Sequence, residues 1–170
     1  MLYCYSQLDY RVRPLVLSIK RWAKNNKINE ARLQTLSSYS LSLMVIHYLQ
    51  AGVTPPVLPC LQKTQPGVFN CESDIFNLPY TAQPLSSNNT DPLGKLFVGF
   101  FKYYTTPNRF NTLRDVASVR EGRKLRREDC EHYSRVMRTG PGQWSAHLLI
   151  EEPFDRTNAA RLESSILLSK

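Results

Sequence analysis

The sequence lacks the features that would place it in a membrane, on a secretory route or around a structural zinc ion. No apolar run approaches the roughly 20 residues that span a bilayer, so we expect no membrane association. The four cysteines form no C-x-x-C pair, so a zinc-site spacing is absent. No signal peptide is expected, because Tyr3, Gln7, Asp9 and Arg11 interrupt any apolar run near the start. Reduced intracellular thiols follow as the expectation.

Acidic residues are in short supply relative to basic ones. The 170 residues carry 22 Lys and Arg against 14 Asp and Glu, a formal net charge of +8. This balance favours polyanionic partners such as nucleic acid, nucleotide phosphates or an anionic membrane, and a solvated basic face is the alternative. With 42% hydrophobic residues, the whole chain, residues 1–170, is interpreted as one globular domain.

The first part of that domain, residues 1–52, is expected to be helical. Apolar side chains recur at steps of three and four from 5 to 26, with Pro14 inside the pattern as a kink or as the start of a second helix. Residues 38–50 are apolar on most sides, which is typical of a buried helix. Ser37 suits its N-cap, and Gly52 lies where a C-cap glycine belongs.

A proline-rich segment, residues 53–92, follows. Its seven prolines exclude a continuous helix or a central strand, so we interpret it as an extended wrap over the surface. A third helix is expected to open at its end, with Asp91 as N-cap and Pro92 at the first helical position. Its inner face would be aromatic.

The last part, residues 93–170, is expected to add a small strand pair to this helix. The remaining elements are predicted as a strand at 116–120, an exposed charged excursion at 120–138, a turn at 140–142, a strand at 147–150 and a closing helix at 158–168. The predicted fold class is therefore mostly α with a small β-strand pair, an α+β arrangement.

A basic stripe borders the apolar face of the first helix. Arg13, Lys20, Lys24 and Lys27 fall on one side at about 100° per residue. A bound polyphosphate would turn the repulsion between Lys20 and Lys24 into attraction. A solvated basic edge is the alternative.

Hydroxyl side chains gather at the start of the second expected helix, in the run Thr35-Leu36-Ser37-Ser38-Tyr39-Ser40. Free backbone N–H groups at a helix start bind anions, and an aromatic ring beside them can stack on a base. The alternative is that Ser37 only caps the helix and Tyr39 only packs.

Carboxylates cluster between the last strand and the closing helix. Glu151, Glu152 and Asp155 lie within five positions, and paired carboxylates can do acid–base work or hold Mg²⁺. The alternative is that Asp155 or Thr157 caps the closing helix and the glutamates are exposed.

Five motifs in sequence resemble one family of enzymes. The runs are Arg11-Val12-Arg13-Pro14-Leu15-Val16-Leu17, Ile19-Lys20-Arg21-Trp22-Ala23-Lys24, the hydroxyl run through Leu41, Pro92-Leu93-Gly94-Lys95-Leu96 through Phe100-Phe101-Lys102-Tyr103-Tyr104, and Glu151-Glu152-Pro153-Phe154-Asp155 with Asn158 and Arg161. Together they resemble the helical central domain and poly(A)-polymerase-associated region of noncanonical terminal nucleotidyltransferases. The likeness is greatest to cytoplasmic poly(A) polymerases of the germ-line development type.

The resemblance implies roles for six residues in nucleotide binding. Lys20 and Lys24 would bind the triphosphate, and Ser38 would add a phosphate hydrogen bond. Tyr39 would stack on the base. Glu152 and Asn158 would lie near the base edge.

The resemblance also implies a preference for one base. Uridylyl-adding relatives carry histidine where this chain has Asn158, and histidine crowds a purine whereas asparagine leaves room. ATP is therefore the expected substrate, with a uridylyltransferase as the alternative.

The chain departs from the family in its carboxylates. Relatives hold Mg²⁺ (or Mn²⁺) with aspartates of a preceding catalytic domain, two of them in an Asp-x-Asp pair. This sequence contains no Asp-x-Asp pair. The run most similar to an Asp-x-Asp pair is Glu72-Ser73-Asp74, in the proline-rich segment. No catalytic residue is therefore expected here, and the chain alone is expected to be inactive. Arg156 also replaces a glycine that relatives often carry.

The implied partners are the RNA 3′ end and RNA-binding adaptor proteins. Basic residues of the charged excursion would contact RNA or be solvated: Arg120, Arg123, Arg126 and Arg127. The implied location is the cytoplasm, with the nucleus as a further site. The alternative function is an inert module that binds RNA or a protein.

Overall fold

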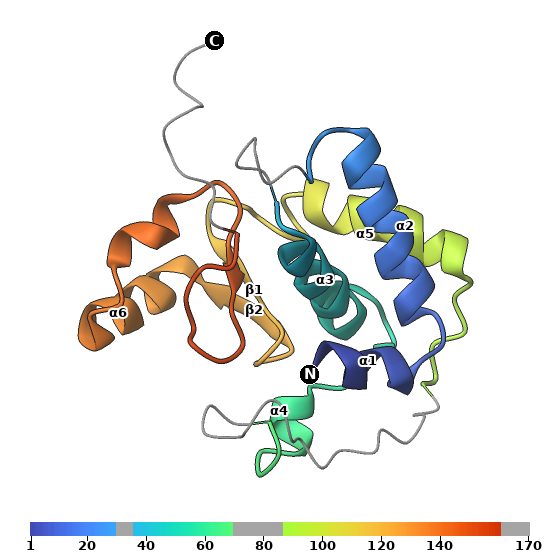
Figure 1. Cartoon of the computed structure of the whole chain (residues 1–170), viewed down its shortest axis with the longest axis horizontal. Coiled ribbons are helices and arrows are strands. Elements are labelled where there is room, and N and C mark those ends of the chain that lie inside the picture. The colour runs from blue at the N-terminus through green and yellow to red at the C-terminus, as the bar shows by residue number, and fades with distance from the viewer. Residues whose placement is uncertain (30–35, 70–86, 161–170) are drawn as a thin grey trace.

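The computed structural model of this chain describes residues 1–29, 36–69 and 87–160. Helices α1 (Leu2–Leu8), α2 (Val12–Asn25), α3 (Ser38–His47) and α5 (Leu93–Thr105) form the larger part. A small sheet and α6 (Arg127–Met137) form the other part, and α3 lies between the two (Figure 1). The expected α+β class, with mostly helical content, is confirmed.

The single helix expected at 5–26 is two helices, α1 and α2. Asp9 adopts an extended conformation between them, and its Oδ1 accepts hydrogen bonds from the backbone N–H and the Nε of Arg11, both at 2.9 Å. Pro14 is the third residue of α2. The N–H groups of the first turn have no partner within a helix, so proline costs little there and starts a helix rather than kinking one.

Helix α3 has the cap that the sequence predicts. Ser37 Oγ accepts from the backbone N–H of Ser40 at 2.9 Å, and every residue from 40 to 47 is buried. The helix widens into a π-helical turn, Tyr48–Gly52. The expected C-cap role of Gly52 is wrong. Gly52 is the last residue of the π-helical turn, and it does not have the positive φ that a C-cap glycine adopts. Glycine is needed there because a Cβ would strike the rings of Tyr48 and Tyr103.

Part of the proline-rich segment is described, and it contains a short helix, α4 (Leu61–Thr64). The expectation of a wholly extended wrap is therefore wrong for this stretch. Residues 70–86 lie outside the described residues.

Helix α5 presents the expected aromatic face to α2 and to the π-helical turn. Trp22 of α2 packs edge-on against Phe101, with ring centroids 4.5 Å apart. The start differs from the prediction: Pro92, and not Asp91, is the N-cap, and no side chain caps it. Asp91 instead pairs with Lys95 at 2.6 Å, one turn into the helix.

The sheet has three strands in the order β2-β1-β3, where a pair was expected. Strand β1 (Asp115–Ser118) is antiparallel to β2 (Arg123–Arg126) and parallel to β3 (Ile150–Glu151). The segment expected as a charged excursion thus supplies both an edge strand and α6. A charged edge strand shows no apolar alternation, which is why the sequence pattern misses it.

The segment after α6 also differs from its predicted elements. A 3₁₀-helix, Pro141–Ser145, stands at the expected turn, and only Ile150 of the expected strand at 147–150 is in a strand. Asn158 pairs with Glu151 in an isolated bridge, so the closing helix does not begin at 158. Residues 161–168 lie outside the described residues.

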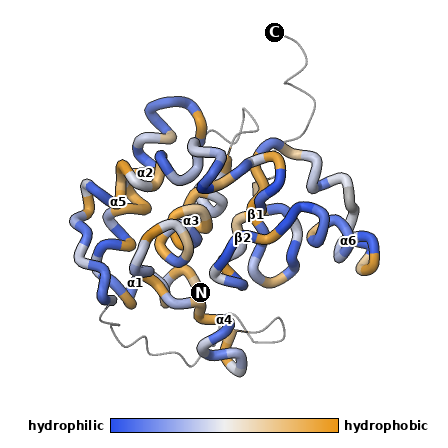
Figure 2. The backbone as a smooth tube through the Cα atoms, turned by 180° about the vertical axis from the view of Figure 1, so that it is seen from behind, coloured by the Kyte–Doolittle hydropathy of each residue, from blue (hydrophilic) through white to orange (hydrophobic). Residues whose placement is uncertain are grey.

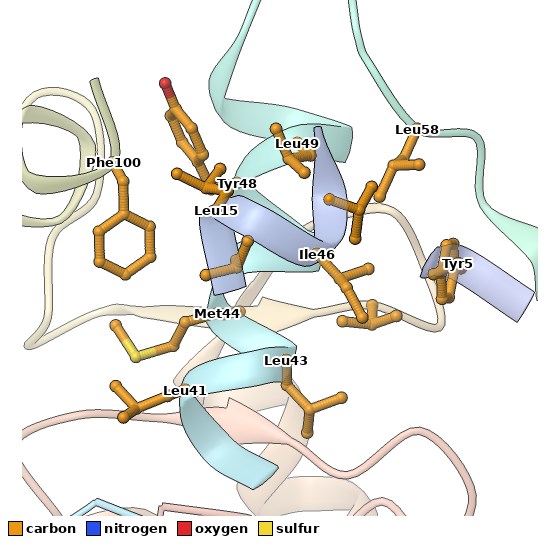
Figure 3. Close-up of a cluster of buried hydrophobic side chains, with 14 of the residues drawn as sticks. Tyr5, Leu15, Leu41, Leu43, Met44, Ile46, Tyr48, Leu49, Leu58 and Phe100 are labelled. Atoms are coloured by element: carbon orange, nitrogen blue, oxygen red, sulfur yellow. The ribbon is translucent and has the colours of Figure 1, made fainter. Parts of the chain in front are cut away.

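The main hydrophobic core surrounds α3 on all sides (Figure 3). A second, smaller cluster under α6 consists of Val116, Cys130, Trp144 and Leu149. Apolar residues are accordingly frequent along the helices of the larger part, whereas α6 and β2 are largely hydrophilic (Figure 2). Within the described ranges, no helix has the length and apolar character needed to cross a membrane.

Candidate functional site

The first turn of α3 meets the loop after β3, residues 152–158. Tyr39 donates its hydroxyl hydrogen to Glu152 Oε1 at 2.6 Å, across 113 positions of sequence. Ser40 Oγ donates to the carbonyl oxygen of Ala159 at 2.7 Å. Two of the predicted site residues, Tyr39 and Glu152, are therefore in direct contact.

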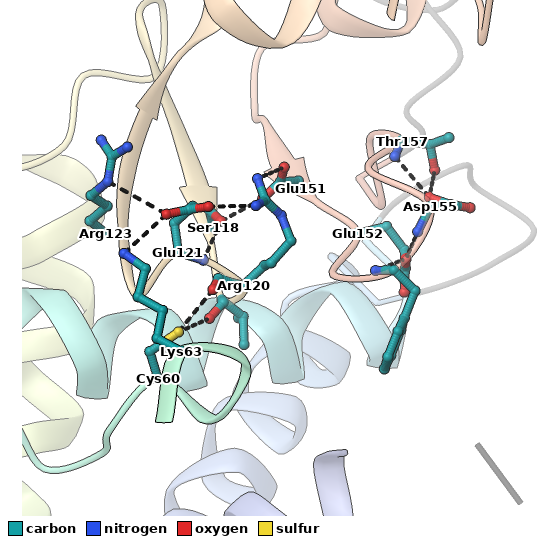
Figure 4. A network of polar contacts seen from close by, with 12 residues as sticks. Cys60, Lys63, Ser118, Arg120, Glu121, Arg123, Glu151, Glu152, Asp155 and Thr157 are labelled. Atoms are coloured by element: carbon teal, nitrogen blue, oxygen red, sulfur yellow. Dashed lines mark hydrogen bonds and ion pairs between the residues drawn. The ribbon is translucent and has the colours of Figure 1, made fainter. Parts of the chain in front are cut away.

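The carboxylates of this loop organise its backbone. Glu152 Oε2 accepts from the N–H groups of Phe154 at 2.6 Å and Asp155 at 2.8 Å (Figure 4). Asp155 Oδ1 accepts from both the N–H and the hydroxyl of Thr157. The loop is thus fixed by its own acidic side chains, one of which also holds Tyr39.

Tyr39 combines a held hydroxyl with an accessible ring. Burial and the hydrogen bond to Glu152 raise the pKa of Tyr39 well above its usual value, so the hydroxyl stays protonated and keeps donating. The residue nevertheless retains 36% of its surface exposed. An exposed ring held in a fixed orientation can stack on a planar group.

The end of α2 lies beside the start of α3. Ser38 Oγ donates to Asn29 Oδ1 at 3.2 Å, which links the two segments (Figure 1). Lys20 lines a pocket of about 410 Å³ between α1, α2 and α3, together with Arg13 and Ser42. Lys24, one turn further along α2, is exposed. Ser38 and the two lysines thus lie on adjoining elements of one edge.

Asn158 lies inside the loop, with only 1% of its surface exposed. Its Oδ1 accepts from the N–H groups of Ile150 at 3.1 Å and Ala160 at 3.0 Å. Its Nδ2 donates to the carbonyl oxygen of Gln143, whose side-chain oxygen accepts the N–H of Asn158 in return. The amide expected at the base edge therefore faces the loop interior. Sequence reasoning missed Gln143, because no spacing or periodicity marks it.

Arg156 adopts a left-handed backbone conformation, with φ of 57°. Its guanidinium lies over the ring of Tyr133 on α6, 4.6 Å from the ring centroid. Glycine reaches this conformation without steric cost, which gives a physical reason for the glycine that relatives often carry there. Arg156 thus adopts a conformation that favours glycine, and its side chain adds a contact to α6.

The four arginines expected to contact RNA do not form one exposed set. Arg120 donates to Glu151 Oε1 at 2.8 Å and also pairs with Glu121, and its side chain is 19% exposed (Figure 4). Arg127 donates to the carbonyl oxygen of Ala146 at 2.8 Å. Only Arg123 and Arg126 are exposed. The expectation for Arg120 is corrected, because neighbouring carboxylates already neutralise its charge.

The carboxylate cluster does not fit a metal ion. Glu151 is buried, where it accepts from Ser118 and Arg120, while Glu152 binds the loop backbone. Across residues 1–29, 36–69 and 87–160, no three His, Cys, Asp or Glu side chains are grouped so that they could hold a metal ion. The acidic residues of this site therefore shape the fold. The segment Glu72-Ser73-Asp74 lies outside those ranges.

Comparison with known proteins places the whole chain beside one group of enzymes. The profile of the Cid1 family poly A polymerase matches residues 92–158. The chain is 43% identical over 165 residues to poly(A) RNA polymerase gld-2 homolog A of Drosophila melanogaster, which is 95% of this chain and 12% of that protein. It is thus much shorter than that relative.

Two solved structures share the fold. One is that of a GLD-2/RNP-8 complex, with a TM-score of 0.68 and 40% identity over 89% of this chain and 44% of that one. The other is a histidine-to-asparagine mutant of the Cid1 poly(U) polymerase bound to MgATP, from work on UTP selectivity. It has a TM-score of 0.71 and 31% identity over 95% of this chain and 47% of that one.

Proposed function

Because this chain belongs to the family of noncanonical poly(A) polymerases and terminal nucleotidyltransferases, we propose that it is the part of an RNA 3′-terminal adenylyltransferase that binds ATP. The whole enzyme would add AMP to RNA 3′ ends without a template. The observation that carries the proposal is the contact between Tyr39 and Glu152, which holds a partly exposed aromatic side chain in the first turn of α3.

The triphosphate would be bound by cations at the edge formed by α2 and α3. Lys20 and Lys24 lie one helical turn apart on α2, so each would reach a different phosphate group of the same triphosphate. Ser38 lies in the first turn of α3, where helix N–H groups point outward and favour an anion. Ser38 Oγ would exchange its hydrogen bond to Asn29 for one to a phosphate oxygen.

The base would stack on Tyr39 and meet the loop held by Glu152 and Asn158. Asparagine at this position supports a preference for ATP over UTP. A histidine-to-asparagine mutant of the Cid1 poly(U) polymerase has been solved with MgATP bound, in work on UTP selectivity. We therefore place the selection of the base in residues 152–158.

The chemical step would need metal ions from another part of the polymerase. Mg²⁺ (or Mn²⁺) would neutralise the phosphates and activate the RNA 3′ hydroxyl. The carboxylates described above are committed to the fold, so this chain would bind and orient the nucleotide. We expect purified residues 1–170 to show no RNA tailing with ATP and Mg²⁺, and measurable tailing would refute this division of roles.

The partners of the whole enzyme would be an RNA 3′ end and an adaptor protein. The solved complex of a GLD-2 with RNP-8 supports the adaptor. The family implies a location in the cytoplasm, with the nucleus as a further site. Arg123 and Arg126, the exposed pair on β2, are the arginines that remain suited to RNA.

The nucleotide-binding proposal is tested on the 170-residue chain itself. Titration with ATP, followed by ¹H–¹⁵N NMR, should shift the amide signals of the first turn of α3 and of residues 152–158. The double variant K20A/K24A should weaken ATP binding at least about ten-fold, because it removes two charge-assisted contacts. The matched control is Lys102→Ala, an exposed lysine on α5.

Three outcomes would contradict the proposal. If the control weakens ATP binding as much as the double variant, the contact is only general charge attraction. If the chain binds RNA but not ATP, it is a binding module rather than a nucleotide site. A higher affinity for UTP than for ATP would favour a uridylyltransferase.

A further inference from the structure

We propose that Gln143 is a positioning residue for base selection, acting through Asn158. This inference rests on the proposed function, because it assumes that residues 152–158 meet the base. It concerns a residue that no motif marks and that lies outside the loop, in the 3₁₀-helix after α6.

Gln143 and Asn158 are joined by two reciprocal hydrogen bonds. The backbone N–H of Asn158 donates to Gln143 Oε1 at 2.7 Å, and Asn158 Nδ2 donates to the Gln143 carbonyl oxygen at 3.0 Å. The Asn158 side chain also accepts from the N–H groups of Ile150, in β3, and of Ala160. Gln143 thus links this asparagine to the 3₁₀-helix, while Ile150 links it to the sheet.

Gln143 is in turn held by the C-terminal end of α6. Its Nε2 donates to Ser134 Oγ at 3.4 Å and to the Thr139 carbonyl oxygen at 3.0 Å. Ser134 is fully buried and also accepts from Trp144 Nε1 at 2.7 Å. The orientation of the Gln143 amide is therefore fixed: Nε2 points to α6, and Oε1 points to Asn158.

The burial of Asn158 decides how this pair would act on a base. Both acceptor positions of Oδ1 and one hydrogen of Nδ2 are already used, so the amide has little left for a ligand. Asn158 would then select the base through the shape that it gives the loop, rather than mainly by contact. The contacts that anchor this shape from outside the loop include those of Tyr39 with Glu152, Gln143 with Asn158 and Tyr133 with Arg156.

The test compares ATP and UTP, which share the triphosphate and ribose and differ only in the base. The ratio of their affinities for the 170-residue chain is measured by NMR titration for the wild type and three variants. Gln143→Leu removes all three hydrogen bonds of the side-chain amide, whereas Gln143→Glu keeps an acceptor for the Asn158 N–H. Gln65→Leu, a half-buried glutamine at the end of α4, is the matched control.

We expect Gln143→Leu to lower the ATP:UTP affinity ratio about five-fold, the effect of one lost hydrogen bond. Gln143→Glu should keep the ratio within about two-fold, and Gln65→Leu should leave it unchanged. If Gln143→Leu does not fold, the inference is decided by Ser134→Ala, which removes one of the two acceptors of Gln143 Nε2 and leaves the Thr139 carbonyl oxygen. Ser134→Ala should then lower the ratio, by less than Gln143→Leu would, and an unchanged ratio in this folded variant would overturn the inference.

A folded Gln143→Leu chain with a lower melting temperature and an unchanged ratio would overturn the inference, because the residue would then only support the fold. The proposed function would stand in that case if Asn158→His still shifts the ratio toward UTP. A wild-type chain that binds neither nucleotide overturns both.

Discussion

The helical part and the sheet part of this molecule are held together by different forces. Around α3 the interior is apolar, and Leu43, Val45 and Leu49 have no exposed surface (Figure 3). The sheet part has a small apolar cluster under α6 and, beside it, a buried polar network that joins Ser118, Arg120 and Glu151 (Figure 4). Apolar burial gives stability without demanding exact partners, whereas a buried polar network contributes only when every member is satisfied.

Both parts contain buried polar atoms without a hydrogen-bond partner in the described structure, and in the helical part these include Gln50 Oε1. Arg120 Nε and Arg127 Nε are buried and without a hydrogen-bond partner in the described structure. For Arg120 the cost of this unpaired atom offsets part of what its ion pairs with Glu121 and Glu151 contribute. The helical part should therefore dominate the free energy of unfolding, and the sheet part should supply the specific geometry that the candidate site needs.

The largest expected effect is a cavity in the helical part. Leu43→Ala removes a fully buried side chain at the centre of α3 and should lower the free energy of unfolding by about 2–5 kcal/mol. Urea unfolding followed by circular dichroism measures this. The control is Leu17→Ala, at an α2 position that is 56% exposed. Equal losses at both positions would mean that α3 is not the centre of the core.

A second test concerns the junction between the two parts, where His47 is fully buried. Its Nδ1 faces the Ser118 carbonyl, which can only accept, so Nδ1 carries the hydrogen and Nε2 accepts from Tyr103. Burial lowers the pKa of His47 to about 4. The unfolded chain, with an ordinary histidine pKa of about 6.5, binds more protons between these values, so stability falls as the pH falls.

The expected loss from pH 6.5 to 4 is about 3 kcal/mol, at 1.36 kcal/mol per pKa unit. Urea unfolding at a series of pH values measures it. Asp9 and Asp115 contribute little in this window, because their pKa values are lowered below the ordinary 3.8. An exposed histidine, replaced in His147→Gln, is the control. A slope that survives in a folded His47→Gln variant would assign the effect elsewhere.

The helical part and the sheet part also differ in how much of their structure the sequence could predict. Helix α3, its Ser37 cap and the aromatic face of α5 depend on neighbours within a turn or two, so local patterns identify them. Strand β2 reads Arg-Lys-Leu-Arg, and its partner lies across a turn, so no local pattern predicts it. Local sequence patterns therefore predict the apolar helices, whereas the polar strand β2 is identified only in the structure.

The candidate site divides in the same way. Family motifs select Tyr39 and Glu152, but their contact crosses 113 positions and no local pattern contains it. Asn158 was selected as well, yet its burial and its link to Gln143 follow only from the folded loop. Arg120 looks like any basic surface residue until Glu151 and Glu121 are seen beside it.

A third test breaks the polar network. Glu151→Leu leaves the guanidinium of Arg120 with only Glu121 as a partner and should cost about 2 kcal/mol of unfolding free energy. The double variant R120M/E151L should recover part of this loss, because no charge is then left buried. The exposed pair of Arg135 and Glu131 on α6 is the control, and Arg135→Met should change stability by less than about 0.5 kcal/mol. If the double variant is the least stable of the three, the network contributes more than its desolvation costs.

The smallest expected effect is at Arg156, where the sheet part imposes a backbone conformation. Its φ of 57° favours glycine, so Arg156→Gly should be more stable than Arg156→Ala by about 1 kcal/mol, although both lose the contact with Tyr133. Arg123 on β2 gives the matched control, because an extended strand position reverses the order and Ala should be more stable than Gly there. Thermal unfolding of the four variants measures both differences. An alanine variant at 156 as stable as the glycine variant would show that the loop can leave the left-handed conformation, and the geometry that places Asn158 would then not depend on it.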